Sequence, residues 1–144
     1  SKSLKKSIFN KGFVIKSNEN FEAVMRACSQ IKRKHEDSTW INEDFVQAYT
    51  NLHHLDIAFS IECYLNEELV GGLYGLLIGN IFCGESMFAK VTDASKVAFY
   101  HLCQQAEENG IKLIDCQVYN DHLASLGAYE ISREKYFEIL NENI

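Results

Sequence analysis

The stretch AFSIECYLNEELVGGLYGLLIGNIFCGESMFA, residues 58–89, decides the fold. It is rich in Ile, Leu, Tyr and Phe, and its side chains alternate in polarity. Turn signals occur at NEE (66–68) and IGN (78–80). Alternation with a period of two residues is typical of strands, and Asn and Gly at the breaks favour turns. The stretch therefore predicts three antiparallel strands at about 58–65, 68–78 and 80–88.

Two helices and a short strand are expected before these strands. GFVIKS (12–17) predicts the strand, and NENFEAVMRACSQIKRK (18–34) predicts a helix behind an Asn cap. A second helix is expected from about Asn42. The inward apolar residues at helical spacing are Phe21, Val24, Met25 and Cys28 in the first helix, and Phe45, Val46, Tyr49 and Leu52 in the second.

Three more elements are expected after the strands. DASKVAFYHLCQQAEENG (93–110) predicts a helix from an Asp93 cap to a Gly110 stop. IKLIDCQV (111–118) predicts a strand parallel to a neighbour, and SREKYFEILNEN (132–143) a final helix. The predicted fold class is α/β of the α+β kind, a mixed, mostly antiparallel sheet flanked by helices.

The totals indicate one globular domain over residues 1–144. No apolar run approaches the ~20 residues that span a bilayer, and the basic start lacks an apolar signal region. Five cysteines without a CxxC pair indicate reduced thiols, which favours a cytoplasmic location. The five histidines show no metal-ligand spacing, so neither a metal nor a cofactor is expected.

Charge is distributed unevenly along the chain. Residues 1–34 contain nine Lys and Arg residues and two acidic residues, whereas residues 35–144 contain five Lys and Arg residues and eighteen acidic residues. The net charge of the whole chain is −6. A basic face on an acidic body suggests contact with phosphates. The alternative is a solvated, Lys-rich first helix.

Three polar groups interrupt the apolar strands. Glu85 lies in NIFCGESMFAK (80–90), and Asp115 and Gln117 lie in IKLIDCQVYND (111–121). Burying a lone carboxylate is costly unless it is paired. Asp115 and Gln117 are two residues apart and so face the same side of a strand. They indicate either a site or an ion-paired, solvent-facing edge strand.

Several motifs in order resemble one family. They are STWIN (38–42), FSIECY (59–64), ELVGGLYG (68–75), IFCGESMF (81–88), ASK (94–96), KLIDCQV (112–118) and NDHLASLGAYEISR (120–133). Over roughly residues 38–140, the family core, the chain resembles the leucyl/phenylalanyl-tRNA–protein transferases; residues 1–37 form a basic N-terminal segment. GESMF and LIDCQ with NDH are the most specific motifs.

The resemblance implies a catalytic domain with the fold of the GCN5-related N-acetyltransferases (GNAT). Its acyl donor would be aminoacyl-tRNA, and Leu or Phe would move to the α-amine of acceptor proteins that begin with Arg or Lys. The product would enter the bacterial N-end-rule route of protein degradation. The expected partners are Leu-tRNA, Phe-tRNA and these acceptors, with no membrane and no metal.

The resemblance also implies roles for single residues. Asp115 would orient the acceptor amine and take its proton, and Gln117 would hydrogen-bond the amine or the ester carbonyl. Glu85 would lie in the pocket for the donor amino acid. The apolar walls of this pocket would be Leu73, Phe82 and Ile114, with Val97 nearby. Plain core packing is the alternative for each wall.

Further residues follow from the same resemblance. Trp40 would stack on the 3′-terminal adenine of the tRNA, or else pack as a hydrophobic staple on the helix it precedes. At the start of the central helix, Ser95 and Lys96 would help to bind phosphate or ribose, with a solvated first-turn Lys as the alternative. His122 would be a structural hydrogen-bonding residue.

Two departures leave other functions open. The additional N-terminal domain of the family, with its Trp-rich segment, and a C-terminal extension have no counterpart here, which predicts weaker binding of aminoacyl-tRNA. An inactive tRNA- or peptide-binding domain is therefore one alternative. An acyl-CoA-dependent N-acetyltransferase is the other, but AKVTDASKVA (89–98) lacks the glycines that cradle a pyrophosphate before the central helix.

Overall fold

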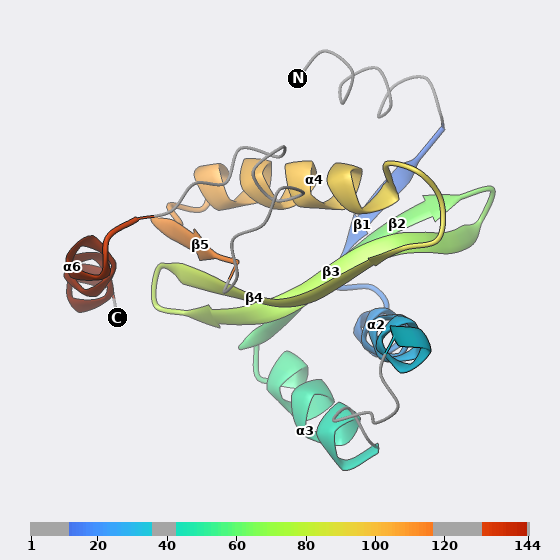
Figure 1. The fold of residues 1–144 in the computed structure, drawn as a ribbon, viewed down its shortest axis with the longest axis horizontal. Helices are drawn as coiled ribbons and strands as arrows, with labels where there is room; N and C mark the ends of the chain where they lie inside the picture. The colour runs from blue at the N-terminus through green and yellow to red at the C-terminus, as the bar shows by residue number, and fades with distance from the viewer. Residues whose placement is uncertain (1–11, 36–42, 117–130, 144) are drawn as a thin grey trace.

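A five-stranded sheet with helices on both faces forms the described part of the computed structural model, residues 12–35, 43–116 and 131–143 (Figure 1). Its elements are β1 (Val14–Ser17), α2 (Phe21–His35), α3 (Glu43–His54), β2 (Ala58–Leu65), β3 (Glu68–Ile78), β4 (Ile81–Ala89), α4 (Ala94–Glu108), β5 (Leu113–Asp115) and α6 (Arg133–Asn143). The strand order is β1-β2-β3-β4-β5; β1 to β4 are antiparallel, and β5 is parallel to β4. The expected mixed, mostly antiparallel α/β class is confirmed.

The predicted boundaries agree with the structure to within a few residues except at β5, and one expected helix cap does not form its hydrogen bond. β5 is shorter than the strand expected over 111–118, and residues 117 and 118 lie outside the described part. Asp93 precedes α4 as expected, but its side chain makes no capping hydrogen bond, because its left-handed backbone (φ 72°) differs from the extended backbone of an ordinary cap. Gly110 (φ 71°) ends α4 as expected.

The sheet has a core on each face, since α4 covers one side and α2 and α3 cover the other (Figure 1). The α2/α3 core includes Phe21, Val24, Met25, Val46, Tyr74 and Phe88. The α4 core includes Ile61, Leu73, Phe82, Ala98, Phe99 and Leu102. Successive residues of a strand point to opposite faces, so neighbours such as Leu73 and Tyr74 belong to different cores.

Gly71 lets α4 begin directly on the sheet. A Cβ at Gly71 would lie 2.6 Å from the Cβ of Ala94, the first residue of α4, a separation that real side chains do not adopt. Ala94 is itself fully buried. The start of α4 is therefore set by a residue that has no side chain.

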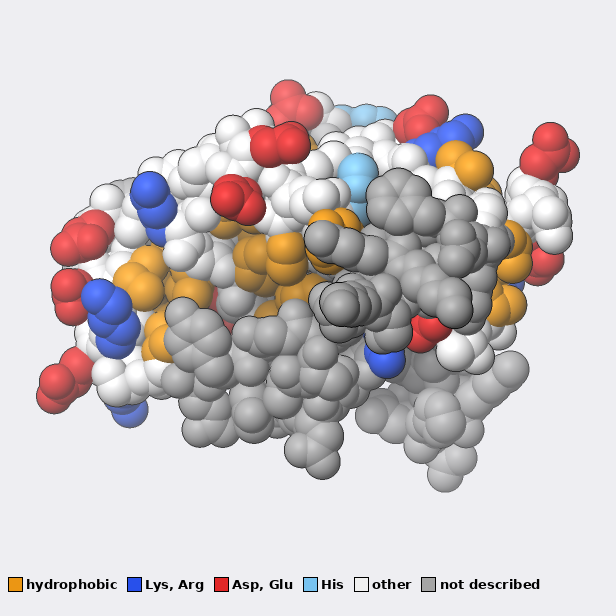
Figure 2. Space-filling model, turned by 90° about the horizontal axis from the view of Figure 1, so that it is seen from above, with side chains coloured by type: hydrophobic (Ala, Val, Ile, Leu, Met, Phe, Trp, Pro, Cys, Tyr) orange, Lys and Arg blue, Asp and Glu red, His pale blue; other side chains and the backbone are white. Residues whose placement is uncertain are grey.

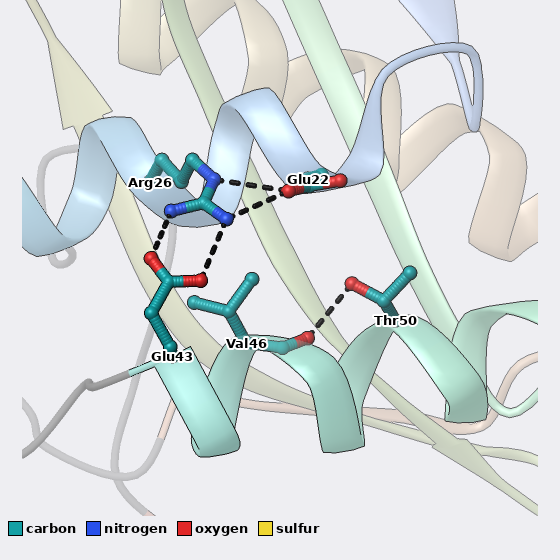
Figure 3. A network of polar contacts seen from close by, with 5 residues as sticks. All are labelled: Glu22, Arg26, Glu43, Val46 and Thr50. Atoms are coloured by element: carbon teal, nitrogen blue, oxygen red, sulfur yellow. Dashed lines mark hydrogen bonds and ion pairs between the residues drawn. The ribbon is translucent and has the colours of Figure 1, made fainter.

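Arg26 joins the two helices of the other face (Figure 3). Its guanidinium donates hydrogen bonds to Glu22 on its own helix, at 2.8 and 3.0 Å, and to Glu43 at the start of α3, at 2.6 and 3.0 Å. Within α3, the Thr50 hydroxyl donates to the Val46 carbonyl oxygen at 2.7 Å. The fork-like guanidinium makes two parallel bonds to Glu43, which orients α3 relative to α2.

Glu62 on β2 is a fully buried carboxylate that the expected polar groups did not include. Its Oε1 accepts the backbone N–H groups of Glu19 and Asn20 at 2.9 and 3.2 Å, and its Oε2 accepts the Ser60 hydroxyl at 2.6 Å. The two backbone donors lie directly before α2. Glu62 therefore ties the start of this helix to the sheet, a structural use of a buried acid.

Candidate functional site

Glu85 is the extra residue of a β-bulge in β4. Tyr74 pairs with Ser86 and Gly75 pairs with Gly84, so Glu85 has no partner of its own across the ladder. Side chains at a bulge are turned away from the regular alternation, and bulges concentrate near functional sites. The Glu85 side chain is half-buried rather than fully buried.

A second glycine makes this bulge possible. A Cβ at Gly75 would collide with the carbonyl oxygen of Cys83 and with the ring of Phe82. The register shift in the ladder falls between Tyr74 and Gly75, where the two backbones come together. The glycine therefore permits the close approach at the point where Glu85 leaves the ladder.

Two tyrosines on the α2/α3 side neighbour the Glu85 carboxylate. Burial is the main cause that raises the pKa of the Tyr49 phenol, and the charge of Glu85 and a side-chain hydrogen bond with it raise that pKa further. Burial likewise raises the pKa of the Tyr74 phenol, followed by the charges of Cys28, Glu85 and Tyr49. Glu85 is thus directed toward α3 and Tyr74.

Asp115 lies on the same side of the sheet as the neighbouring Cys83. The two residues are paired in the parallel β4–β5 ladder, in which strands lie about 4.8 Å apart. The phenol of Tyr136, on α6, donates a hydrogen bond to Oδ2 of Asp115 at 2.8 Å. Burial raises the pKa of the Cys83 thiol, and the charges of Asp115 and Glu85 add to this effect. Cys83 therefore has the carboxylates of Asp115 and Glu85 as charged neighbours.

This arrangement has a definite chemical capacity. Two half-buried carboxylates on one stretch of sheet attract a cationic group such as an ammonium, and either one can accept a proton from it. No cluster of three or more His, Cys, Asp or Glu residues that could hold a metal ion occurs in residues 12–35, 43–116 and 131–143. No described helix is long and apolar enough to cross a membrane.

The three expected apolar walls come together in one cluster. Leu73 (3% exposed) and Phe82 (5%) are buried there, and half-buried Ile114 packs against them. The cluster lies on the α4 side, whereas Tyr49 and Tyr74 belong to the α2/α3 side. In the view onto the α4 side, apolar side chains gather left of and near the centre, with charged side chains at the left edge and along the top (Figure 2).

The other expected site residues lie outside this apolar cluster or outside the described part of the chain. Val97 packs in a separate cluster with Cys63 and Val70. Ser95 is 8% exposed in the first turn of α4, and Lys96 pairs with Asp93 at 3.9 Å. The remaining expected residues, Trp40, Gln117 and His122, lie outside the described part of the chain.

Three residues of the site were not among the expected ones. Cys83 stands two positions before Glu85, and its pairing with Asp115 depends on the register of β4 and β5. Tyr49 was expected to point inward but not to meet an acid. Tyr136 follows Asp115 by 21 positions, and nothing in the sequence indicates that they meet.

Comparisons with known proteins give one consistent family. The family model described as leucyl/phenylalanyl-tRNA protein transferase matches residues 1–141. A transferase of that name from Flavobacterium johnsoniae is 49% identical over 140 residues, which are 97% of this chain and 66% of the relative. Its namesake from Nitrosospira multiformis is 47% identical over 142 residues, 99% of this chain and 61% of the relative. The chain thus spans less than two thirds of the length of either relative.

Solved structures share the fold at low sequence identity. An aminoglycoside acetyltransferase from an uncultured soil metagenomic sample superposes with a TM-score of 0.66 at 12% identity, covering 85% of this chain and 93% of that one. A possible acetyltransferase from Clostridium difficile superposes with a TM-score of 0.63 at 11% identity, covering 83% of this chain and 92% of that one. These similarities confirm the expected GNAT-like fold. At such low sequence identities they say nothing about activity.

Proposed function

Because the chain belongs to the leucyl/phenylalanyl-tRNA protein transferase family, we propose that it carries the site that moves Leu or Phe from aminoacyl-tRNA to an N-terminal Arg or Lys of acceptor proteins. The observation that carries this proposal is that Asp115 pairs with Cys83 across the β4–β5 ladder and that the charges of both Asp115 and Glu85 act on the Cys83 thiol. Each of the two substrates brings an α-amino group, and each amino group needs an anionic partner. The modified acceptor would then enter the N-end-rule route in the cytoplasm.

Asp115 would act on the acceptor amine. An α-amine is partly protonated at neutral pH and must lose a proton before it attacks. In the proposed step the Asp115 carboxylate takes this proton, and the neutral nitrogen forms an amide bond with the ester carbonyl carbon. The bond from that carbon to the ribose oxygen breaks, and the ribose oxygen leaves with the second proton that the attacking nitrogen loses as it becomes an amide. Gln117 would hydrogen-bond the amine or the carbonyl.

Glu85 would hold the ammonium of the donor amino acid. Its carboxylate is half-buried, where a charge pair is stronger than in water. The expected walls Leu73, Phe82 and Ile114 lie on the opposite, α4 face of the sheet, so the Leu or Phe side chain would instead pack beside Glu85 against the aromatic rings of Tyr49 and Tyr74. Trp40 would stack on the terminal adenine, and Ser95 would contribute near the ribose or phosphate.

An acyl-CoA-dependent acetyltransferase is less well supported, although solved structures with this fold include one with acetyl-CoA. Residues 89–98 contain no glycine that would open the backbone toward a pyrophosphate. The start of α4 also packs closely on β3, with Ala94 against Gly71. Titration with acetyl-CoA separates the two functions, since only an acetyltransferase would show saturable binding.

The deciding experiment follows radiolabelled Leu from Leu-tRNA to a protein that begins with Arg. Wild type should transfer the label, and Asp115→Ala should reduce the rate by about 100-fold or more, the range for loss of a general base. Glu107→Gln, an exposed acid on α4, is the control and should transfer like wild type. An unchanged rate in Asp115→Ala would exclude the proposed role of Asp115. Binding of Leu-tRNA without transfer by wild type would favour the alternative of a binding domain.

A further inference from the structure

Helix α6 lies beside the β5 edge of the sheet (Figure 1). None of its residues within Arg133–Asn143 is fully buried. Its half-buried residues share one helical face at i, i+3, i+4 and i+7, and they are Tyr136, Ile139, Leu140 and Asn143. A helix that buries so little apolar surface gains little from packing, so its polar contacts decide how it is held.

Hydrogen bonds to the β3–β4 turn and to β5 lie at the two ends of this face. Near its C-terminal end, the Asn143 carbonyl oxygen accepts the backbone N–H of Asn80 at 2.9 Å. Near its N-terminal end, the Tyr136 hydroxyl donates to Oδ2 of Asp115 at 2.8 Å. The second contact joins the helix to a carboxylate of the candidate site rather than to an ordinary backbone group.

We propose that Tyr136 is a positioning residue that holds the Asp115 carboxylate in the orientation needed to receive the acceptor amine. The inference rests on the proposed function and adds a residue to its site. β5 has only three residues and is the last strand of the sheet in the described part of the chain, and Asp115 is its last residue, so the strand itself constrains the carboxylate weakly. A hydrogen bond from a phenol to a carboxylate is charge-assisted and directional, and it fixes the plane of the carboxylate.

The Tyr136 phenol remains a donor over the working pH range. Its hydrogen bond to Asp115 is the largest cause that raises its pKa, followed by burial and by the charges of Asp115 and Cys83. A phenol with a pKa above the ordinary value of about 10 is protonated at neutral pH. An ionised carboxylate has about four lone-pair sites, so it can keep this hydrogen bond and accept another from an amine.

The test in the reaction is a double-mutant cycle. Tyr136→Phe keeps the ring and removes the hydroxyl, and it should reduce kcat/KM for the acceptor by about tenfold through kcat, the order expected for a lost charge-assisted hydrogen bond. In the Asp115→Asn background the same change should have no further effect, because the group that it positions is gone. Equal losses in both backgrounds, or no loss in wild type, would overturn the proposal.

Two controls separate positioning from loosening of the helix. Tyr100→Phe makes the same chemical change on α4, where the phenol accepts a hydrogen bond from Gln104 at 3.2 Å, and it should transfer like wild type. Asn143→Ala weakens the other end of the α6 face, where Oδ1 accepts from the Asn80 amide at 3.5 Å. A loss in Asn143→Ala equal to that in Tyr136→Phe would show that docking of α6, and not the phenol, matters.

A titration tests the pair without any transfer. The phenol signal of Tyr136 in an NMR titration is identified by its absence in Tyr136→Phe. Its pKa should fall in Asp115→Asn, since the hydrogen bond to a carboxylate and the charge of that carboxylate, which both raise it, have been removed. An unchanged pKa would overturn the Tyr136–Asp115 pair. A pKa that falls in Asp115→Asn, together with no transfer by the wild-type chain, would count against the proposed function alone.

Discussion

Cys83 and Asp115 are paired across the parallel strands β4 and β5, and both lie on the side of the sheet to which Glu85 is directed. Burial and the two carboxylate charges raise the pKa of the Cys83 thiol. The thiol thus reports on the charge at the centre of the candidate site, and it can be read in a protein that has no substrate bound.

Asp115→Asn should increase the reactivity of Cys83 toward iodoacetamide. A neighbouring negative charge disfavours the thiolate, so removing it lowers the pKa and raises the thiolate fraction at a given pH. At pH 8 we expect alkylation to be about threefold faster, measured by mass spectrometry of the Cys83 peptide. Buried Cys63, whose pKa is raised to about 12, is an internal control and should stay unreacted.

Loosening of α6 could also speed the alkylation of Cys83. Tyr136→Phe loses the hydrogen bond to Asp115 but keeps the carboxylate charge, so it should leave the rate close to that of wild type. The interpretation of the charge effect is wrong if Tyr136→Phe and Asp115→Asn accelerate the reaction equally.

Glu62→Gln should destabilise the protein by about 1–3 kcal/mol, the cost of leaving buried groups unpaired. The new amide NH₂ would face the backbone N–H donors of Glu19 and Asn20 or the hydroxyl of Ser60, and a donor cannot accept from them. Urea unfolding measures the change. Glu68→Gln, an exposed change in β3, should stay within about 0.5 kcal/mol. A similar small effect at both positions would refute the structural role of Glu62.

Gly71→Ala should destabilise the protein by about 1–3 kcal/mol, because the added methyl group overlaps the Cβ of Ala94 and displaces the start of α4. Thermal and urea unfolding would show this loss. Gly84→Ala is the matched control for stability: its Cβ would meet the Asp115 carbonyl oxygen at 3.5 Å, an ordinary contact. Equal losses for the two variants would mean that the approach of α4 is not limited at Gly71.

Tyr74→Phe should leave stability unchanged or raise it by up to about 1 kcal/mol. The Tyr74 hydroxyl is buried, and in the described part of the chain it has no hydrogen-bond partner, so its removal relieves an unpaired polar group. The same unfolding measurement applies. A loss above about 1 kcal/mol would show that the hydroxyl has a stabilising partner.

The sequence by itself determined the elements and their class. Residues 58–89 alternate with period two, Phe21 to Cys28 follow helical spacing, and Gly110 ends α4; each is a local property that the structure confirms. The motifs around GESMF and LIDCQ indicated the family, and the match of the family model over residues 1–141 confirms it. Local periodicity decides such features because a side chain must face either the core or water.

The tertiary structure alone decided which polar groups meet. The bulge at Glu85, the pairing of Cys83 with Asp115, and the hydrogen bond from Tyr136 depend on strand register and on the docking of α6, and a shift of one residue would turn these side chains to the other face. The same holds for Glu62, an acid in an apolar strand like Glu85, which serves the start of α2 instead of the candidate site. Sequence spacing places a carboxylate on a strand, but its partners come from elements far away in the chain, and those partners determine its role.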